Sequence, residues 1–439
     1  MNNVLVPICW FTITSLALTT VRSALPPEET PLPRPLTLDR SLDQATRHNP
    51  ALQRTQEQIR EQQGVLVEVR SAQLPSLGTS GSYRSTEDRL LESPLSEKTN
   101  WTVDVTARQV LYAGGGVRAK IRSQHEQLEA AKLAFAAALN DMVLTVRQHF
   151  YAVLLDRELI GVQEEALQVL ESERTNAQRK REAGNGSDFD LLRAEVAVAN
   201  ARPALIRARN TYRVAQDRLR AALGAPAAGS NQPTDLDVQG SLIVPQRQIA
   251  LADALAAARA HRPELLQQER LIKAAEEGIV SARSGYLPTV SAVAGYEWAK
   301  PALITTPQSH LDGWTAGVQT SWNIFEGRAT AGRVAQARSR VNQARFAANE
   351  LALSVDVEVR QAHSALAEAD ELLVASEKVV YQARESLRLA QARFQAGTAT
   401  QLDVLQAQSA LTEARSNLAQ SQHAHAVAIA SLQRAMGSS

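Results

Sequence analysis

The feature that most constrains this chain is an internal repeat with one constant spacing. Asn49-Pro50 returns as Arg262-Pro263, and Leu223-Gly224 returns as Met436-Gly437. Each residue of the second copy lies 213 positions after its counterpart in the first. Because this spacing does not drift, we expect the two copies to build the same supersecondary unit.

Composition excludes several classes of protein. The 47 Lys and Arg residues balance 46 Asp and Glu residues, so no basic excess marks a nucleic-acid partner. The low aromatic content of 4% favours long, thin helical seams over one thick core. The one cysteine, Cys9, lies in the N-terminal apolar segment, which argues against disulfides and thiolate metal sites. The chain lacks G-x-S-x-G, H-E-x-x-H and P-loop motifs, so we expect neither an enzyme nor a cofactor.

The N-terminus predicts secretion. Residues 4–21 are apolar and are followed by the small residues Ser23 and Ala24, which indicates a signal peptide over residues 1–23. The alternative is a single membrane anchor, although Pro7 and the short apolar run argue against it. Residues 24–37 are Pro-rich and predict an extended strap.

The order of elements is the same in both copies. The first repeat (38–224) predicts a helix, a strand pair over 76–112, a long helix over 117–181 and a helix over 187–223. A linker (225–250) separates it from the second repeat (251–439), with a helix, a strand pair over 289–325, a long helix over 330–394 and a helix over 400–436. Such long helices need a coiled-coil partner.

In the second long helix, a heptad pattern of apolar residues supplies a seam for packing against such a partner. One row runs at seven-residue intervals through Val334, Val341 and Val355. A second row, offset by three, is interrupted by Glu358 and Ser386. This second row otherwise contains Ala337, Ala344, Leu351, Ala365, Leu372 and Val379. A 3.5-residue period predicts a left-handed supercoil.

The predicted strands alternate apolar and polar residues over about ten positions, as transmembrane β-strands do. Asp104, Arg108 and Glu297 fall on the polar face and would line a barrel lumen, where simple solvation of a watery interior is the favoured explanation. A half-buried soluble sheet would alternate in the same way. Aromatic residues near the strand ends predict an interfacial girdle of Trp101, Trp298, Trp314, Trp322 and Tyr296.

Four strands cannot close a barrel, and an open sheet edge is not tolerated in lipid. Several chains must therefore contribute strands. Two copies would give about eight strands with a filled interior, and three would give about twelve with room for a lumen. A trimer of duplicated chains would have pseudo-sixfold symmetry.

With this order of elements, the sequence resembles the TolC family of outer-membrane efflux and secretion channels. The resemblance covers about residues 36–438 and rests on the twofold order of elements and on four short motifs. These are Ser41-Leu42 with Asn49-Pro50, then Leu74-Pro75, then Trp314 with Ile324-Phe325-Glu326-Gly327, and finally residues 397–405. It implies an α+β membrane protein that is not an enzyme.

The resemblance also implies the assembly and its partners. It predicts a homotrimer whose 12-stranded β-barrel, four strands per chain, lies in the outer membrane and continues into a periplasmic α-helical coiled-coil barrel. This tunnel would dock on a periplasmic adaptor protein and an inner-membrane pump of the RND or ABC type. The cargo stays open, because the pump selects it.

Both helix–helix turns carry a carboxylate in an N-cap pattern. Ser187-x-x-Asp190 and Thr400-x-x-Asp403 match the [ST]-x-x-[DE] signature, and capping alone would explain both acids. The resemblance implies a further role, with Asp403 lining the periplasmic entrance and Asp190 joining a network that holds it shut.

At the entrance, the sequence departs from the family pattern at three positions. Phe394 stands where the family can use Tyr, Ala399 where it can use Arg, and Gln406 where a second aspartate can occur. Phe394 has no phenolic hydroxyl and Ala399 has no charge. Any latch in this chain is therefore expected to be built differently or to be weaker.

The sequence leaves open one alternative from another class of protein. A non-channel structural or adaptor coiled-coil protein of the periplasm would have the same helices with a soluble sheet. Fractionation distinguishes the two, because only the channel requires detergent for extraction.

Overall fold

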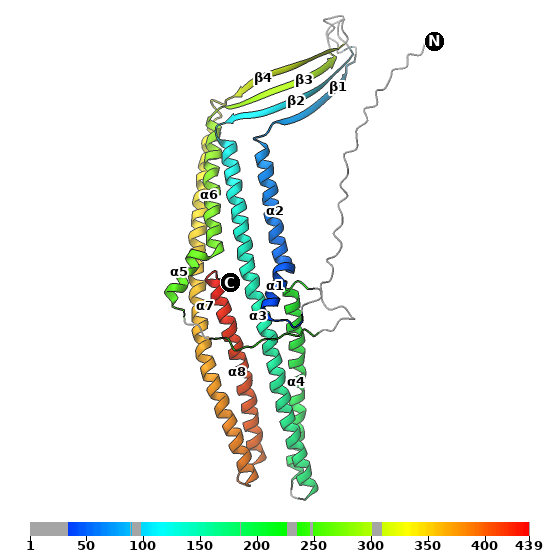
Figure 1. Ribbon diagram of the computed structural model, residues 1–439, viewed down its shortest axis with the longest axis vertical. Coiled ribbons are helices and arrows are strands. Elements are labelled where there is room, and N and C mark those ends of the chain that lie inside the picture. Colours follow the sequence, from blue (N-terminus) through cyan, green and yellow to red (C-terminus); the bar gives the residue numbers. More distant parts are fainter. Residues whose placement is uncertain are drawn as a thin grey trace, which may run out of the picture.

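The computed structural model describes residues 34–87, 89, 98–184, 186–225, 235–245, 249–300 and 310–438. The predicted signal peptide (1–23) and most of the predicted strap (24–37) lie outside these ranges. The molecule is elongated, with nearly parallel helical columns below a curved sheet (Figure 1). Among the described residues, no helix is both long enough and apolar enough to span a membrane.

Both repeats contain the same elements in the same order. The first comprises α1 (Leu38–His48), α2 (Pro50–Ser71), β1 (Ser76–Ser85), β2 (Thr99–Ala113), α3 (Gly116–Glu182) and α4 (Asp188–Ala222). The second comprises α5 (Leu251–His261), α6 (Pro263–Arg283), η2 (Ser284–Tyr286), β3 (Thr289–Lys300), β4 (Leu311–Ser321), α7 (Ala329–Gln395) and α8 (Gln401–Ala435).

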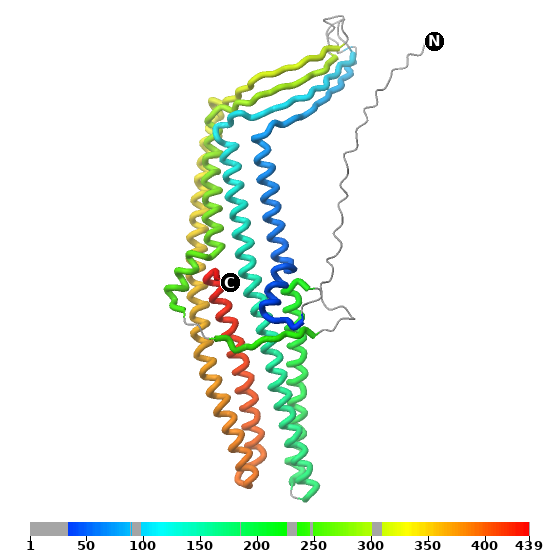
Figure 2. The backbone as a smooth tube through the Cα atoms, viewed as in Figure 1, coloured from blue at the N-terminus to red at the C-terminus, as the bar shows by residue number. Residues whose placement is uncertain are grey.

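The helix lengths repeat as closely as the sequence does. α3 and α7 each have 67 residues, and α4 and α8 each have 35. A 67-residue helix is about 100 Å long at ~1.5 Å per residue. The upper part of α3 lies beside α2 and α6, and its lower part lies beside α4 and α8 (Figure 2). Two shorter helices, stacked along the axis, therefore flank each long one.

Proline and glycine set where these helices begin. Pro50 and Pro263 occupy the first helical positions, where a missing N–H has no cost. Gly114 (φ 57°) and Gly115 (φ 80°) turn the chain from β2 into α3. A Cβ on Gly114 would lie 2.8 Å from the Leu287 Cβ, so the turn also needs the space that glycine leaves.

The described strands form one antiparallel sheet in the order β1-β2-β3-β4. The register places Thr79, Val105, Tyr296 and Trp314 side by side in one row. The residues that alternate with them are mostly polar or glycine, so the predicted separation of an apolar and a polar face is present across the sheet. An irregularity between Val110 and Tyr112 shifts the pairing near the helical end of β2.

The prediction that the last strand runs to residue 325 is wrong. β4 ends at Ser321, and Trp322, assigned to the aromatic girdle as a strand residue, lies beyond it. Side-chain hydrogen bonds hold the segment in a turn, since Asn323 Nδ2 donates to Glu326 Oε1 at 2.5 Å. The Trp322 indole N–H donates to the Tyr286 carbonyl at 3.1 Å, which ties this turn to the end of η2.

The predicted seam of α7 is correct in its upper half and shifted below. Val334, Ala337 and Val341 are buried as expected, but Leu372 and Val379 are exposed. From Val355 downward, Val355 and Ala369 of the first row stay buried, and the second row is replaced by Val359, Leu366 and Val380, four residues after the first row. The cause is a change of partner, since α7 packs on α6 above and on α8 below. A helix with 3.6 residues per turn also drifts against a strict heptad.

Two apolar clusters lie near the middle of the columns. The first surrounds Phe150 and Leu154 of α3 and includes Leu236, Val238 and Leu242 from the segment between the repeats. Leu36 forms a parallel bridge with Val238, so the described end of the strap is fastened there. The second cluster surrounds Val355 and Val359 of α7 and is poorer in large side chains. The inter-repeat segment thus covers the first cluster.

Candidate functional site

The polar face of the sheet gathers the predicted lumen residues. Asp104 lies directly opposite Glu297 in the β2–β3 register, so two carboxylates share one level. Asp104 accepts hydrogen bonds from Ser80 and, at 3.1 Å, from Thr106 Oγ1. Arg108 lies on the same face, four residues nearer the helices. These contacts show a solvated polar wall; its role as a barrel lumen stays a prediction.

The opposite face carries the predicted aromatic girdle. Trp314 is 76% exposed and Trp298 is 41% exposed, although both are apolar. Tyr296 and Trp298 stack with ring centroids 4.5 Å apart, and Trp101 lies at the same end of β2. Trp322 is exposed at the other end of the sheet, beside the helices. Exposed aromatics at both ends of an apolar sheet face are what a lipid interface would use.

The second helix turn is closed by a reciprocal capping box. The Thr400 N–H donates to Asp403 Oδ2 at 2.8 Å, and the Asp403 N–H donates to Thr400 Oγ1 at 3.3 Å. The hydrogen bonds that the Thr400 N–H and the Thr400 hydroxyl donate to the Asp403 carboxylate lower the pKa of that carboxyl, and Arg393 adds a smaller electrostatic contribution. Asp403 therefore carries its charge in the first turn of α8 while it caps the helix.

The first turn is built differently. Ser187 caps α4 by accepting from the Phe189 N–H at 3.1 Å, while the Asp190 N–H donates to the Ser187 carbonyl at 3.1 Å. The predicted box between Ser187 and Asp190 is thus replaced by a one-way cap. Asp188 instead bridges the turn with an ion pair to Arg181 at 2.5 Å. The two turns occupy equivalent positions with different chemistry.

One contact between the turns was not anticipated from the sequence. Lys180 Nζ of α3 lies 4.3 Å from the centroid of the Phe394 ring of α7. This cation–π contact joins the lower ends of two helical hairpins, α3–α4 and α7–α8, within one chain. Phe394 therefore makes a link that needs no hydroxyl, whereas Gln406 is exposed on α8. The signal available in the sequence was only a lysine in the last turns of α3.

Comparisons with known proteins show the family of this chain. The family model described as outer membrane efflux protein matches residues 41–225 and again residues 254–438. The starts of the two matches differ by the same 213 residues as the repeat.

Individual relatives agree with this match. Protein CyaE of Bordetella pertussis is 25% identical over 382 residues, covering 87% of this chain and 79% of that protein. The outer membrane efflux protein BepC of Brucella suis is 24% identical over 412 residues, covering 91% and 85%. The solved structure of the Campylobacter jejuni CmeC outer membrane channel has the same fold, with a TM-score of 0.77 at 15% identity, covering 91% of this chain and 85% of that one.

These matches span both repeats and decide against the alternative of a non-channel coiled-coil protein. They also place the chain in the outer membrane, with its helical columns on the periplasmic side. The chain belongs to the outer membrane efflux protein family, whose members are passive channels rather than enzymes.

Proposed function

We propose that three copies of this chain form the exit duct of a tripartite efflux or type I secretion system. The observation that carries the proposal is that the sheet, as described, has two lateral edges without a strand partner in the same chain. β1 and β4 are the edge strands of the sheet, and both are exposed along their whole length. In lipid such edges must be paired. Because the strands alternate in direction, β4 of one copy can pair antiparallel with β1 of the next and close a barrel of about twelve strands.

The helical columns have matching free faces below the sheet. α4 lies at one side of the lower columns and α7 at the other (Figure 1). Each carries exposed apolar residues at helical spacing, which in a stable assembly would be covered. On α4 these are Phe189, Leu192, Val196, Ile206 and Val214, and on the part of α7 at the same height they are Leu372, Val374, Val379, Tyr381 and Leu389. A ring of identical copies would cover both faces through one repeated contact.

The heights of these residues suggest a direct test. Ile206 is 18 residues from the start of α4, and Tyr381 is 14 residues from the end of α7, so both lie about 20 to 30 Å above the turns. Ile206→Cys combined with Tyr381→Cys, in a Cys9→Ser background, should yield a disulfide-linked trimer in detergent. The single-cysteine variants are the controls, and native mass spectrometry should give the mass of three chains. A stable monomer, or crosslinks confined to dimers, would contradict the proposal.

An exit duct of this kind needs partner proteins that deliver the cargo to its periplasmic end. We propose that a periplasmic adaptor and an inner-membrane pump of the RND or ABC type recruit the turns at the lower end. Affinity purification of the tagged channel after crosslinking in cells should recover an adaptor. Cysteine crosslinkers placed near Gly184 and Gly397 should capture it, and the same crosslinkers on the sheet should not.

The carboxylates of the two turns would then surround the entrance. We propose that Asp403 lowers the barrier to cations there, with Asp190 on the neighbouring hairpin contributing charge. The capping box accounts for Asp403 without this role, so the experiment must separate the two. Asp403→Asn keeps a cap acceptor and removes the charge, whereas Thr400→Ala weakens the cap and keeps the charge. Single-channel recordings should show altered cation selectivity and divalent block for Asp403→Asn alone.

A further inference from the structure

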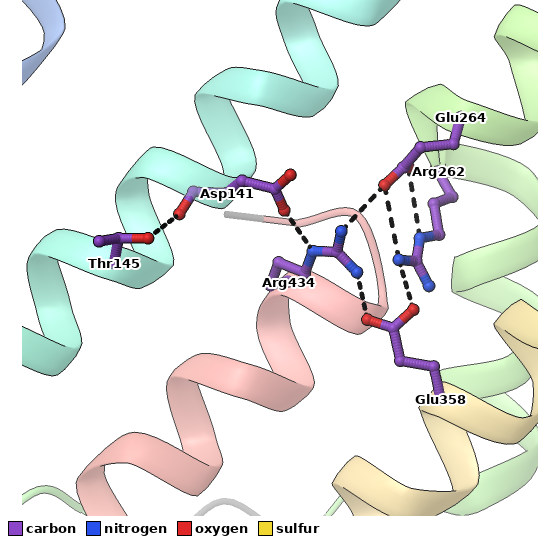
Figure 3. Close-up of polar contacts among 6 residues, drawn as sticks. All are labelled: Asp141, Thr145, Arg262, Glu264, Glu358 and Arg434. Atoms are coloured by element: carbon purple, nitrogen blue, oxygen red, sulfur yellow. Dashed lines mark hydrogen bonds and ion pairs between the residues drawn. The ribbon is translucent and has the colours of Figure 1, made fainter. Parts of the chain in front are cut away.

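Five charged residues meet where the short and long helices of the second repeat converge. Arg262 and Glu264 come from the junction of α5 and α6, Glu358 from α7, Arg434 from the end of α8, and Asp141 from α3 (Figure 3). Two arginines are thus shared among three carboxylates. Asp141 belongs to the first repeat, so the cluster joins the two halves of the chain.

The contacts are short and form one connected network. Arg262 Nη2 lies 2.6 Å from Glu358 Oε2, and Arg262 Nε lies 3.3 Å from Glu264 Oε2. Arg434 donates to Asp141 Oδ1 at 2.8 Å and to Glu264 Oε1 at 3.2 Å, and it also contacts Glu358. Arg262 is only 3% exposed. The pairs that Arg262 makes are therefore less screened than pairs on an open surface, whereas the Asp141 side chain, which supplies the link to α3, is 55% exposed.

The first repeat lacks this cluster. The positions 213 residues before Arg262, Glu264, Glu358 and Arg434 are Asn49, Ala51, Thr145 and Ala221, none of which is charged. At the first junction the Asn49 amide donates to the Ala222 carbonyl at 2.8 Å and its oxygen caps α2. The two repeats share one backbone plan here but hold their junctions with different interactions.

The apolar clusters explain why the second junction needs charge. Alanines make up 5 of the 10 buried residues of the second cluster but only 3 of the 16 of the first. Leu236 and Val238 of the inter-repeat segment further seal the first cluster. Hairpin α3–α4 is therefore anchored by apolar packing, whereas hairpin α7–α8 has a thinner apolar anchor beside the ion cluster.

We propose that the cluster of Asp141, Arg262, Glu264, Glu358 and Arg434 is an ionic clamp that fixes the upper end of hairpin α7–α8 to α3. The proposal rests on the proposed function, because the clamp sets the position of the second turn at the entrance. Asp141 lies 39 residues above Lys180 on α3, a lever of about 58 Å. A tilt of about 5° at the clamp would move the second turn by roughly 5 Å over that lever.

Spin labels at equivalent positions of the two turns can test the clamp. Glu182→Cys and Gln395→Cys lie 213 residues apart, are both exposed, and report on the first and second turn in a Cys9→Ser background. Pulsed EPR of the assembled protein in nanodiscs measures the distances between copies. The main variant is Asp141→Ser, which introduces the small residue found at the counterpart position, Ser354, and removes the cluster's own link to α3.

A second variant avoids stranded charges. It carries the first-repeat residues at the clamp, Arg262→Asn, Glu264→Ala, Glu358→Thr and Arg434→Ala, together with Asp141→Ser. The matched control is Arg259→Gln with Asp356→Asn, which removes a 2.6 Å ion pair between α5 and α7 that does not reach α3. Arg434→Lys keeps one charge without the planar fork and should give an intermediate result.

In both clamp variants the Gln395 distances should broaden by roughly 5 Å, as the lever predicts, while the Glu182 distances stay unchanged. The control should match the wild type at both labels. Equal broadening at both labels, or none at Gln395, would overturn the clamp. Native mass spectrometry of the same samples reports the number of chains, so failure of the clamp and failure of the trimer are distinguishable.

Discussion

The contact between Lys180 and Phe394 should control how readily the two turns separate. Lys180→Gln removes the cation and keeps a long polar side chain, and Phe394→Leu removes the ring. Because the ammonium lies 4.3 Å from the ring centroid at a partly exposed site, the contact is worth about 0.5–1 kcal/mol. That corresponds to a two- to fivefold change per chain, and to about tenfold to hundredfold if three contacts must release together.

Single-channel recording of the purified protein in planar bilayers measures this effect as open probability. Phe394→Tyr keeps the ring and should behave as the wild type does, and Arg179→Gln removes a neighbouring cation of α3 without touching Phe394. The double variant Lys180→Gln/Phe394→Leu should open no more than either single variant, because both remove the same contact. Additive effects of the two changes, or equal opening by Arg179→Gln, would refute the reasoning.

Three further outcomes follow from backbone and titration. Arg328 has φ 70° where the first repeat has glycine, so Arg328→Gly should raise the apparent free energy of unfolding in urea by ~1 kcal/mol; a decrease would contradict this. Gly224→Ala should destabilise far more than Gly184→Ala in the same titration: both have positive φ, but only the former would place a Cβ against the His48 carbonyl. Burial lowers the pKa of His423, so its contribution to stability is present above pH 6.5 and is lost as the pH falls. His423→Leu should reduce the slope of thermal stability between pH 7 and 5, while the half-buried His149 keeps part of it, and an unchanged slope would count against the reasoning.

The repeat, the helices and the sheet faces could be predicted because their signals are local. Alternation with a period of two assigns each strand residue to a face, and Pro50, Pro263 and Gly114 mark helix starts through their own backbone preferences. The error at Trp322 has the same origin. Its alternation continues past Ser321, but the side chains of the following turn, which periodicity does not register, end the strand.

The ionic clamp and the contact between Lys180 and Phe394 could not be predicted from the sequence, for a different reason. Both depend on which faces of separate helices meet, and Lys180 and Phe394 are 214 residues apart in the chain. Glu358 is instructive, because in the heptad pattern it looks like an interruption of an apolar row. In the structure it binds Arg262 at the α5–α6 junction and Arg434 of α8. A charge that breaks a seam can thus mark where a third element enters.

The segment that joins the repeats has a consequence for how such a chain could have arisen. Leu236 and Val238 are buried against α3, and Leu36 bonds to the same stretch through the Asp237 carbonyl at 2.8 Å. A fusion point that merely tethered two copies would tolerate any sequence. This one has become part of the interior, so the two ancestral halves can no longer be exchanged, separated or reordered without exposing Phe150. The repeat gives the molecule its symmetry, and the packed joint makes the two halves depend on each other.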